Sequence, residues 1–506
     1  MATKRKSTGL SKSLVLKGLQ CRKALWLQKN PPDFDLPARP DLEAKFAAGN
    51  QVGTLAQQLF PGGVEVPYAG LPFATQLART KQLIAKGTKV IYEASFSRGG
   101  VFVKVDILVR DDLAGEDGTA GDSWRIYEVK MGTGVKEVNL DDVATQYYVL
   151  SQCGLNISAA YLTHINNQYV RQGAIDVQQL FTSEEVTSEV LARQAQLPAQ
   201  LQQLRDTLRL DDEPAIDIGP WCNDPFECDF IPYCWQHIPN NSIFDLRGRG
   251  INKFAYYAQG VIKLADIPLD QLNSAQRFQA EATLNQHDTT DTVAISKFVN
   301  SLWYPLCHLD FETFDTPIPP FDGVRPYQKI PFQYSLHIQQ HAGVEPQHCE
   351  YLAAANYDPR RELTEQLISE IPDAACILTY NQAFEKSVLR ELAELFPDLA
   401  EALLQRVDNV RDLMEPFKKR QLYRWQMAGS YSIKAVLPAL VPELSYQQLS
   451  IADGQMAMVA YRAMCEEQNL VTLAEIRKDL LAYCEMDTLA MVRILEVLQG
   501  LLNRSS

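Results

Sequence analysis

The chain has 506 residues, 46% of them hydrophobic and 22% charged, which is the composition of an ordinary folded protein and the length of about three domains. The net charge of −14 excludes nucleic-acid binding through bulk positive charge, so any such binding must rely on local basic groups and bound cations. The sequence contains neither a run of about 18 apolar residues that would span a membrane nor the apolar core of a signal peptide, so we expect a cytoplasmic protein without membrane partners.

Cysteines mark both ends of the first part of the chain. Cys21 lies near the amino end, and Cys222, Cys228 and Cys234 follow at two equal gaps in a loop rich in proline and aromatic residues. Cytoplasmic thiols stay reduced or bind metal rather than pair as disulfides. Four thiolates suit either a zinc ion or an iron–sulfur cluster.

Two strands are predicted between these cysteines. In the first, at residues 101–110, every second residue is β-branched, which predicts one apolar face and places Asp106 on the other. The apolar face consists of Val101, Val103, Val105, Ile107 and Val109. In the second strand, at residues 124–130, Glu128 and Lys130 are two apart and therefore share a face. The polar, glycine-rich residues 111–123 predict a hairpin loop between the strands.

A helix is predicted after these strands, at residues 140–154, and from it Gln146 could reach the lysine or DNA. Carboxylates on adjacent strands can hold a hard divalent cation. A neighbouring lysine can orient or activate the attacking water and offset phosphate charge. This combination predicts a site for phosphodiester hydrolysis.

Asp106, the Glu128-x-Lys130 pair and Gln146 resemble the motifs of PD-(D/E)XK nucleases of the RecB and AddB type, over roughly residues 10–241. The resemblance implies a restriction-endonuclease-like fold in which all four residues are catalytic and the two acids bind Mg²⁺ or Mn²⁺. Glu93, on the preceding strand, is the counterpart of an accessory acid. The Gln-x-x-x-Tyr helix motif of these nucleases is incomplete, because Leu150 stands at the tyrosine position.

The cysteine arrangement resembles the iron staple of RecB-type nucleases. That resemblance implies a 4Fe–4S cluster held by Cys21, Cys222, Cys228 and Cys234, with zinc as the alternative. The cluster would have a structural role, because it ties the amino-terminal helix to the end of the domain and closes a very long loop.

Residues 242–300 carry short helical patterns interrupted by turns. They resemble a degenerate helix-hairpin-helix, a module that grips DNA phosphates through backbone amides and nearby cations, here Arg247, Arg249 and Lys253. The alternative is a helical linker that packs between two larger units.

The carboxyl-terminal part carries three acidic motifs in order. His308, Asp310 and Glu312 share one face of a predicted strand, so that the two carboxylates lie beside one metal position. A buried strand then leads to Asn381-x-x-Phe384-Glu385 at the start of a helix. Tyr483 and Asp487, four apart in a strongly helical stretch, share a helix face.

This order resembles the DnaQ-like 3′–5′ exonucleases of the DEDDy subtype, on an RNase H-like fold, over residues 301–498. The resemblance implies that Asp310, Glu312, Glu385 and Asp487 hold two divalent ions while Tyr483 positions the attacking water. Glu385 departs from the usual aspartate. Asp412 either supplements the middle acid or caps a helix, and Lys434 either contacts phosphate or is a solvated helix residue.

The predicted fold class is α/β, with a PD-(D/E)XK domain at residues 1–241, a helical segment at 242–300 and an RNase H-like domain at 301–506. The whole chain resembles an uncharacterised bacterial family of such fusions. The expected function is metal-dependent cleavage of DNA in repair, recombination or defence, with or without a partner helicase. An RNA 3′–5′ exonuclease and a non-catalytic nucleic-acid-binding scaffold are the alternatives.

Overall fold

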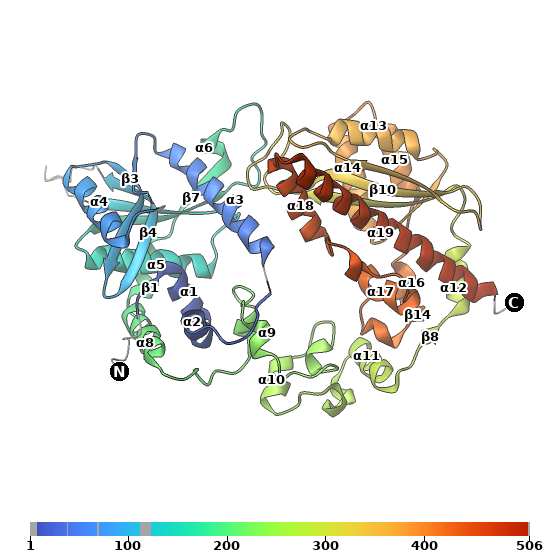
Figure 1. Ribbon diagram of the computed structural model, residues 1–506, viewed down its shortest axis with the longest axis horizontal. Coiled ribbons are helices and arrows are strands. Elements are labelled where there is room, and N and C mark those ends of the chain that lie inside the picture. The colour runs from blue at the N-terminus through green and yellow to red at the C-terminus, as the bar shows by residue number, and fades with distance from the viewer. Residues whose placement is uncertain (1–7, 38, 68–69, 112–122, 504–506) are drawn as a thin grey trace. The chain divides into compact units, whose positions relative to one another are not determined.

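The computed structural model describes residues 8–37, 39–67, 70–111 and 123–503. The chain is mixed α/β and divides into two compact units (Figure 1). The first unit consists of Met1–His237 with Thr316–Tyr327, and the second of Ile238–Asp315 with Gln328–Ser506. Within the described ranges, no helix is both long and apolar enough to cross a membrane.

A mixed sheet forms the centre of the first unit, with seven strands in its described part. The strand order is β2-β3-β4-β5-β6-β7, and β1 pairs with part of β4. Strand β4 is antiparallel to β3 and to β5, whereas β5 and β6 run parallel. The strands are β1 (Leu10–Ser11), β2 (Val64–Glu65), β3 (Val90–Arg98), β4 (Val101–Asp111), β5 (Ser123–Lys130), β6 (Asn156–Ile165) and β7 (Phe181–Glu185).

Helices pack on this sheet through two apolar cores. The larger core takes buried residues from α1, α2, α4, α5, α7 and α8, and the smaller one from α3 and α6. The helices are α1 (Lys12–Gln20), α2 (Arg22–Lys29), α3 (Pro40–Ala56), α4 (Phe73–Ala85), α5 (Glu137–Gln152), α6 (Val177–Leu180), α7 (Thr187–Gln194), α8 (Leu197–Arg209) and α9 (Ile231–Cys234). The predicted helix that carries Gln146 is α5.

The predicted alternation along β4 holds only as far as its middle. Val101, Val103 and Val105 pack in the larger core, but Ile107 and Val109 pack in the smaller one. The change falls at Asp106, beside Glu93 on β3, whose φ of +57° lies in the left-handed region. A residue in this conformation interrupts the regular pleat of a strand. The prediction that all five β-branched residues share one face is therefore wrong beyond Val105.

The predicted hairpin connects β4 to β5, since Asp111 pairs with Ser123 in an antiparallel register. The loop between them, residues 112–122, lies outside the described residues.

The second unit contains a five-stranded sheet in its described part, in the order β11-β10-β9-β12-β13. Strands β11, β10 and β9 are antiparallel neighbours, whereas β9, β12 and β13 run parallel. The strands are β9 (Leu306–Phe314), β10 (Ile330–Gln339), β11 (Gln347–Leu352), β12 (Cys376–Thr379) and β13 (Val410–Asp412). All residues of β10 and β12 are buried, as expected for strands covered on both faces.

Helix α19 (Leu470–Asn503) crosses this sheet and contacts β9, β10 and β11 (Figure 1). The other helices of the sheet region are α13 (Arg360–Glu370), α14 (Gln382–Leu395), α15 (Ala400–Asn409), α16 (Glu415–Lys418), α17 (Ile433–Leu440) and α18 (Gly454–Glu466). The loop between β9 and β10, Thr316–Tyr327, belongs to the first unit.

Residues 242–300, predicted as a separate segment, cluster with the second unit. They form α10 (Lys253–Ala258), α11 (Ser274–Asn285), α12 (Thr292–Val299) and β8 (Thr289–Thr290), which pairs with β14 (Leu422–Tyr423). Two of the three predicted phosphate-binding cations are engaged by backbone carbonyls, because Lys253 donates to Phe244 and Arg247 to Ala428. Arg247 thus joins the segment to the second unit, and the phosphate-binding role stays a prediction.

Candidate active sites

The first site lies at the carboxyl end of β5, where α1 and α5 cover the sheet. Lys130 Nζ donates to Glu128 Oε1 at 2.6 Å and to Asp142 Oδ2 at 2.6 Å. Gln146 Nε2, from α5, donates to Glu128 Oε2 at 2.7 Å and to Asp142 Oδ1 at 3.1 Å. Asp106 Oδ2 accepts a hydrogen bond from the Val129 amide at 2.8 Å. The four residues predicted for this site are thus gathered at one place.

Two further residues belong to this network and were missed from the sequence. Lys12 Nζ, at the start of α1, donates to Glu128 Oε1 at 2.6 Å and lies 3.5 Å from Asp142 Oδ1. Lys12 gives no signal in the sequence, because it lies 116 residues before its partner. Asp142 does give one, because it precedes Gln146 by four residues and hence shares its helix face.

The charges of this site depend on one another. Burial and the Asp106 carboxylate favour protonation of Glu128, but the Lys12 and Lys130 charges outweigh them, so the pKa of Glu128 is lowered. Burial opposes the charge of Lys130, yet Asp142 and Glu128 outweigh it and raise its pKa. Burial raises the pKa of Asp106 despite the charge of Lys12. Lys130 is therefore a permanent cation, suited to orienting water and offsetting negative charge rather than to accepting a proton.

Glu93 also lies at this site, on β3. Its carboxylate pairs with Lys104 at 2.9 Å, and its charge contributes to the raised pKa of Asp106. Left-handed backbone at a non-glycine residue costs about 1–3 kcal/mol and is concentrated at functional sites. Leu150, at the position expected for tyrosine, is instead fully buried in the larger core.

We expect Gln146→Leu to destabilise the first unit by about 1–3 kcal/mol, because the change removes the donor shared by two buried carboxylates. The measurement is urea unfolding followed by far-UV circular dichroism. Gln203→Leu, at an exposed position of α8, is the matched control. Equal unfolding midpoints for the two variants would contradict the role given to the Gln146 amide.

The four predicted cluster ligands also come together, because Cys21, Cys222, Cys228 and Cys234 line one small cavity. All four are free thiols. Burial raises the pKa of Cys228, and it raises that of Cys234 to about 11 against the opposing charge of Lys23.

Contacts around the cavity connect the amino-terminal helices to the segment that carries the three later cysteines. Lys17 pairs with Asp229 at 2.7 Å, and Lys23 pairs with Glu213 at 2.5 Å. Gln20 Nε2 donates to the carbonyl groups of Trp221 and Phe226 at 2.8 and 2.6 Å, respectively. The two ends of the first unit are thus bonded together around the thiols.

The second site is a pocket of about 470 Å³ in the second unit. All five residues predicted for this site line it: Asp310, Glu312, Glu385, Tyr483 and Asp487. Strand β9 supplies the first two, α14 the third and α19 the last two. Carboxylate oxygens of Asp310, Glu312 and Asp487 all lie within 4.8 Å of one another.

The acids of this pocket are held close together with little solvent. Burial and the Asp487 carboxylate raise the pKa of Glu312 to about 8, and burial raises the pKa of Glu385 to about 8. Burial also raises the pKa of Asp487 to about 6, while that of Asp310 is raised well above its ordinary value by burial and by Asp487. Like charges crowded in this way favour protons or cations between them.

Glu385 differs from the other three acids. It is buried, and its Oε2 has no hydrogen-bond partner among the described residues. Its charge contributes to the raised pKa of Asp310, although its oxygens are not among the group within 4.8 Å. A buried, unpaired carboxylate oxygen in a polar pocket is consistent with a ligand position that is completed by a cation.

Asp412 accepts hydrogen bonds from backbone amide groups near the pocket. Its Oδ1 accepts hydrogen bonds from the amides of Asn381 at 2.9 Å and Met414 at 3.0 Å. The two amides belong to the residues that precede α14 and α16, and neither helix has a side-chain cap, so Asp412 joins the two loops rather than capping a helix.

Two further side chains lie close to these acids, and one of them, Lys434, lines the pocket. Tyr446, missed from the sequence, donates to Asp487 Oδ1 at 2.6 Å. Lys434 lines the pocket, lies 5.8 Å above the Tyr483 ring and donates to the Ala452 carbonyl at 2.7 Å. Its charge lowers the pKa of Glu312 and of Asp487 relative to burial alone. Lys434 is thus an exposed cation at the mouth of an acidic pocket.

Comparison with known proteins gives two similarities. Residues 307–432 match a family model described as a domain of unknown function, DUF2779. This segment contains Asp310, Glu312 and Glu385 and ends before Tyr483. A protein of Mycoplasma genitalium, itself named only as uncharacterized, is 25% identical over 308 residues. The match covers 52% of this chain and 45% of the relative, so the chain spans about half the length of the relative it matches.

Proposed function

We propose that this protein is a divalent-metal-dependent nuclease with two hydrolytic sites that cleave phosphodiester bonds in DNA. The observation that carries the proposal is the second-unit pocket, where three carboxylates meet within 4.8 Å and a fourth lines the same pocket. In this proposal the first unit is a RecB-like PD-(D/E)XK domain and the second a DnaQ-like, RNase H-like domain.

The donor set of the second pocket fits two hard divalent cations. Asp310, Glu312, Glu385 and Asp487 would hold Mg²⁺ or Mn²⁺, which take oxygen ligands. When bound, such ions stabilise the attacking and leaving oxygens of an in-line displacement. Tyr483, in the same pocket, would position the attacking water, and the exposed Lys434 would contact the phosphate backbone.

In this proposal the first site would take one such cation in exchange for part of the hydrogen bonding that Lys12, Lys130 and Gln146 now give to the two oxygens of Glu128. Asp106 and Glu128 are close enough that the charge of Asp106 opposes the lowering of the Glu128 pKa by the two lysines, and they would be the metal ligands. Lys130 would orient the attacking water and offset phosphate charge. Lys12 and Gln146 hold Glu128 in position through its two oxygens.

The test is degradation of labelled single- and double-stranded DNA with Mg²⁺ or Mn²⁺. We expect wild-type protein to degrade DNA, Lys130→Ala to lose the activity of the first unit and Asp310→Ala that of the second. If wild type and both variants leave DNA intact with either metal, the protein is a non-catalytic scaffold. Faster degradation of RNA than of DNA in a competition assay would instead assign the substrate to RNA.

The cysteine cavity supports a 4Fe–4S cluster held by Cys21, Cys222, Cys228 and Cys234, since four free thiols from two distant segments line it. We expect anaerobically purified protein to be brown, with a broad visible absorption band. Cys228→Ser should bleach the band and destabilise the first unit, whereas Cys153→Ser, at an exposed cysteine, should leave both unchanged. A colourless wild-type protein containing stoichiometric zinc would replace the cluster by a zinc site.

A further inference from the structure

Three of the seven histidines lie side by side in the second unit. His308 on β9, His337 on β10 and His348 on β11 are direct cross-strand partners. Directly opposed residues on antiparallel strands project from the same face of a sheet. The rings of His337 and His348 stack with 4.6 Å between their centroids. This row of imidazoles has no part in the proposed hydrolysis.

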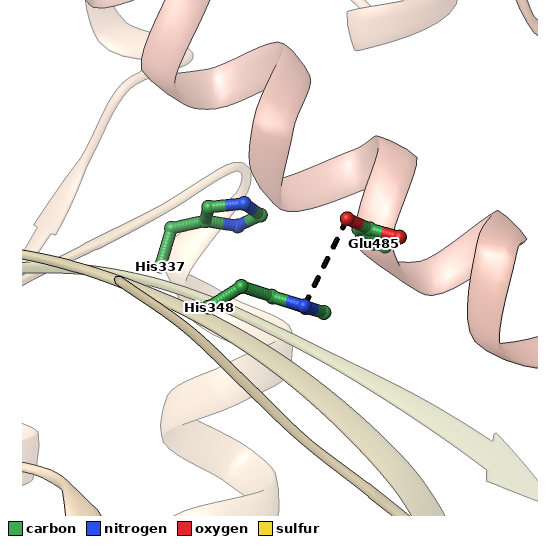
Figure 2. A group of neighbouring side chains, drawn as sticks. All are labelled: His337, His348 and Glu485. Atoms are coloured by element: carbon green, nitrogen blue, oxygen red, sulfur yellow. Dashed lines mark ion pairs between the residues drawn. The ribbon is translucent and has the colours of Figure 1, made fainter. Parts of the chain in front are cut away.

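Helix α19 brings a carboxylate to this row. Donor atoms of His337, His348 and Glu485 all lie within 4.8 Å of one another. His348 Nδ1 lies 3.8 Å from Glu485 Oε1. Figure 2 shows the two rings, from the strands, and the carboxylate, from the helix, grouped around a common space.

The hydrogen bonds behind the rings determine where the imidazole protons lie. Thr488 Oγ1 lies 3.1 Å from the Glu485 carbonyl, and in the arrangement in which it donates to that carbonyl it accepts from its two other neighbours. These are Ser335 Oγ at 2.6 Å and His337 Nδ1 at 2.8 Å. Because the Ser335 proton is then committed to Thr488, Ser335 accepts from His348 Nε2 at 3.0 Å.

In this arrangement both imidazoles carry their proton on the nitrogen that faces the hydroxyl groups. The opposite nitrogens, Nε2 of His337 and Nδ1 of His348, keep their lone pairs. Metal-bound histidines have the same arrangement, in which the second ring nitrogen donates to an oxygen and so fixes the tautomer and the orientation of the ring.

We propose that His337, His348 and Glu485 form a binding site for a divalent transition-metal ion such as Zn²⁺. Two imidazoles and one carboxylate are a ligand set that Zn²⁺ takes with a fourth position left for water. Mg²⁺, which prefers oxygen ligands, is the ion of the acidic pocket and not of this site. Partial exposure of His348 and Glu485 gives an ion access from solvent.

A metal ion bound at this site would constrain helix α19. Glu485 lies between Tyr483 and Asp487 on this helix, while the two histidines lie on β10 and β11. A bound ion would therefore tie the helix segment that carries two pocket residues to the β10–β11 hairpin. This role does not depend on the nuclease proposal, since the ion could stabilise the unit whatever reaction it performs.

The test is calorimetric titration of metal-free, full-length protein with ZnCl₂ in excess Mg²⁺, which is added to compete for the acidic pocket. We expect wild type to bind one Zn²⁺ more than His348→Ala or Glu485→Gln. His341→Ala, an exposed histidine in the turn after β10, is the matched control and should bind as wild type does. Thr488→Val keeps all three ligands but removes the hydroxyl, so Zn²⁺ should bind about 10–100-fold more weakly.

The absorption spectrum of the Co²⁺-loaded protein distinguishes this site from a metal site at the four cysteines. Co²⁺ bound here should add weak d–d absorption without thiolate charge transfer, and His348→Ala should remove that component alone. His348 and Glu485 have side chains 24% and 48% exposed, so their replacement is compatible with folding. Equal Zn²⁺ stoichiometry in wild type, His348→Ala and Glu485→Gln would overturn the proposal, as would Co²⁺ absorption that is entirely of the thiolate type.

Discussion

Replacing Asp310 by asparagine is expected to abolish hydrolysis by the second unit while making the metal-free protein more stable. Asp310 is at the centre of the acidic pocket, and its pKa is raised well above the ordinary value by burial and by Asp487. Asparagine keeps the shape but not the charge, so a cation loses a ligand. Metal-ion stabilisation of the transition state amounts to several kcal/mol, which corresponds to a loss of roughly 10³-fold in rate.

A higher stability of the Asp310→Asn protein would show that its loss of activity is not caused by misfolding. In the metal-free pocket, burial and the Asp487 carboxylate oppose ionisation of Asp310, and Asp310→Asn removes this unfavourable ionisation. We therefore expect a higher melting temperature than that of wild type in the presence of a chelator. The rate is measured in the Lys130→Ala background, so that only the second unit contributes. Glu350→Gln, at an exposed position of β11, is the matched control for both readouts. An Asp310→Asn protein that retains wild-type activity would remove the second unit from the proposed function.

The residues of the second pocket were predictable because local periodicity determines which side chains share a face. Asp310 and Glu312 are two apart on one strand, and Tyr483 and Asp487 are four apart on one helix, and in both cases the structure points the pair into one pocket. Tyr446 was not predictable. It reaches Asp487 from a segment 41 residues earlier, and nothing in the local pattern distinguishes it from other tyrosines.

The first site shows where periodicity fails. Lys12 joins Glu128 only through the packing of α1 on α5, a tertiary contact that leaves no trace in the sequence around either residue. The left-handed backbone of Glu93 is likewise a property of the folded sheet, and it moves Ile107 and Val109 to the other core. Side-chain alternation predicts a strand well, but it cannot predict where the pleat is interrupted.

The three aligned histidines show a third feature that the sequence does not predict. The periodicity of the strand places His308 on its acidic face, but it does not indicate that His337 and His348 lie beside His308. Their alignment depends on the register of β9, β10 and β11. Register is set by the sheet as a whole and by its turns, so side chains on separate strands cannot be paired from one sequence.

The pH dependence of stability gives the second large effect. Glu312 and Glu385 have pKa values of about 8 in the folded protein, against an ordinary value of 4.5. Between these values the folded chain holds protons that the unfolded chain has released. Stability must then fall as pH rises. We expect these two acids to lower the stability of the metal-free second unit by roughly 3–6 kcal/mol between pH of about 5 and about 8. The buried His308 and His337, whose pKa values are lowered to about 3 and about 4, oppose this fall below a pH of about 6.5, so the contribution of the acids is the difference between wild type and Glu312→Gln.

Excess Mg²⁺ should remove most of this loss, because a cation can neutralise the same carboxylates once the protons have left. Thermal melts across this pH window, with chelator or with Mg²⁺, measure both effects. Glu312→Gln should flatten the metal-free profile and weaken the response to Mg²⁺, whereas Glu350→Gln should leave both as in wild type. If wild type and Glu312→Gln instead had the same metal-free profile across this window, the four acids would already be ionised in the folded state. The pocket would then hold them apart by contacts other than those described, and it would have no need of a cation to neutralise them.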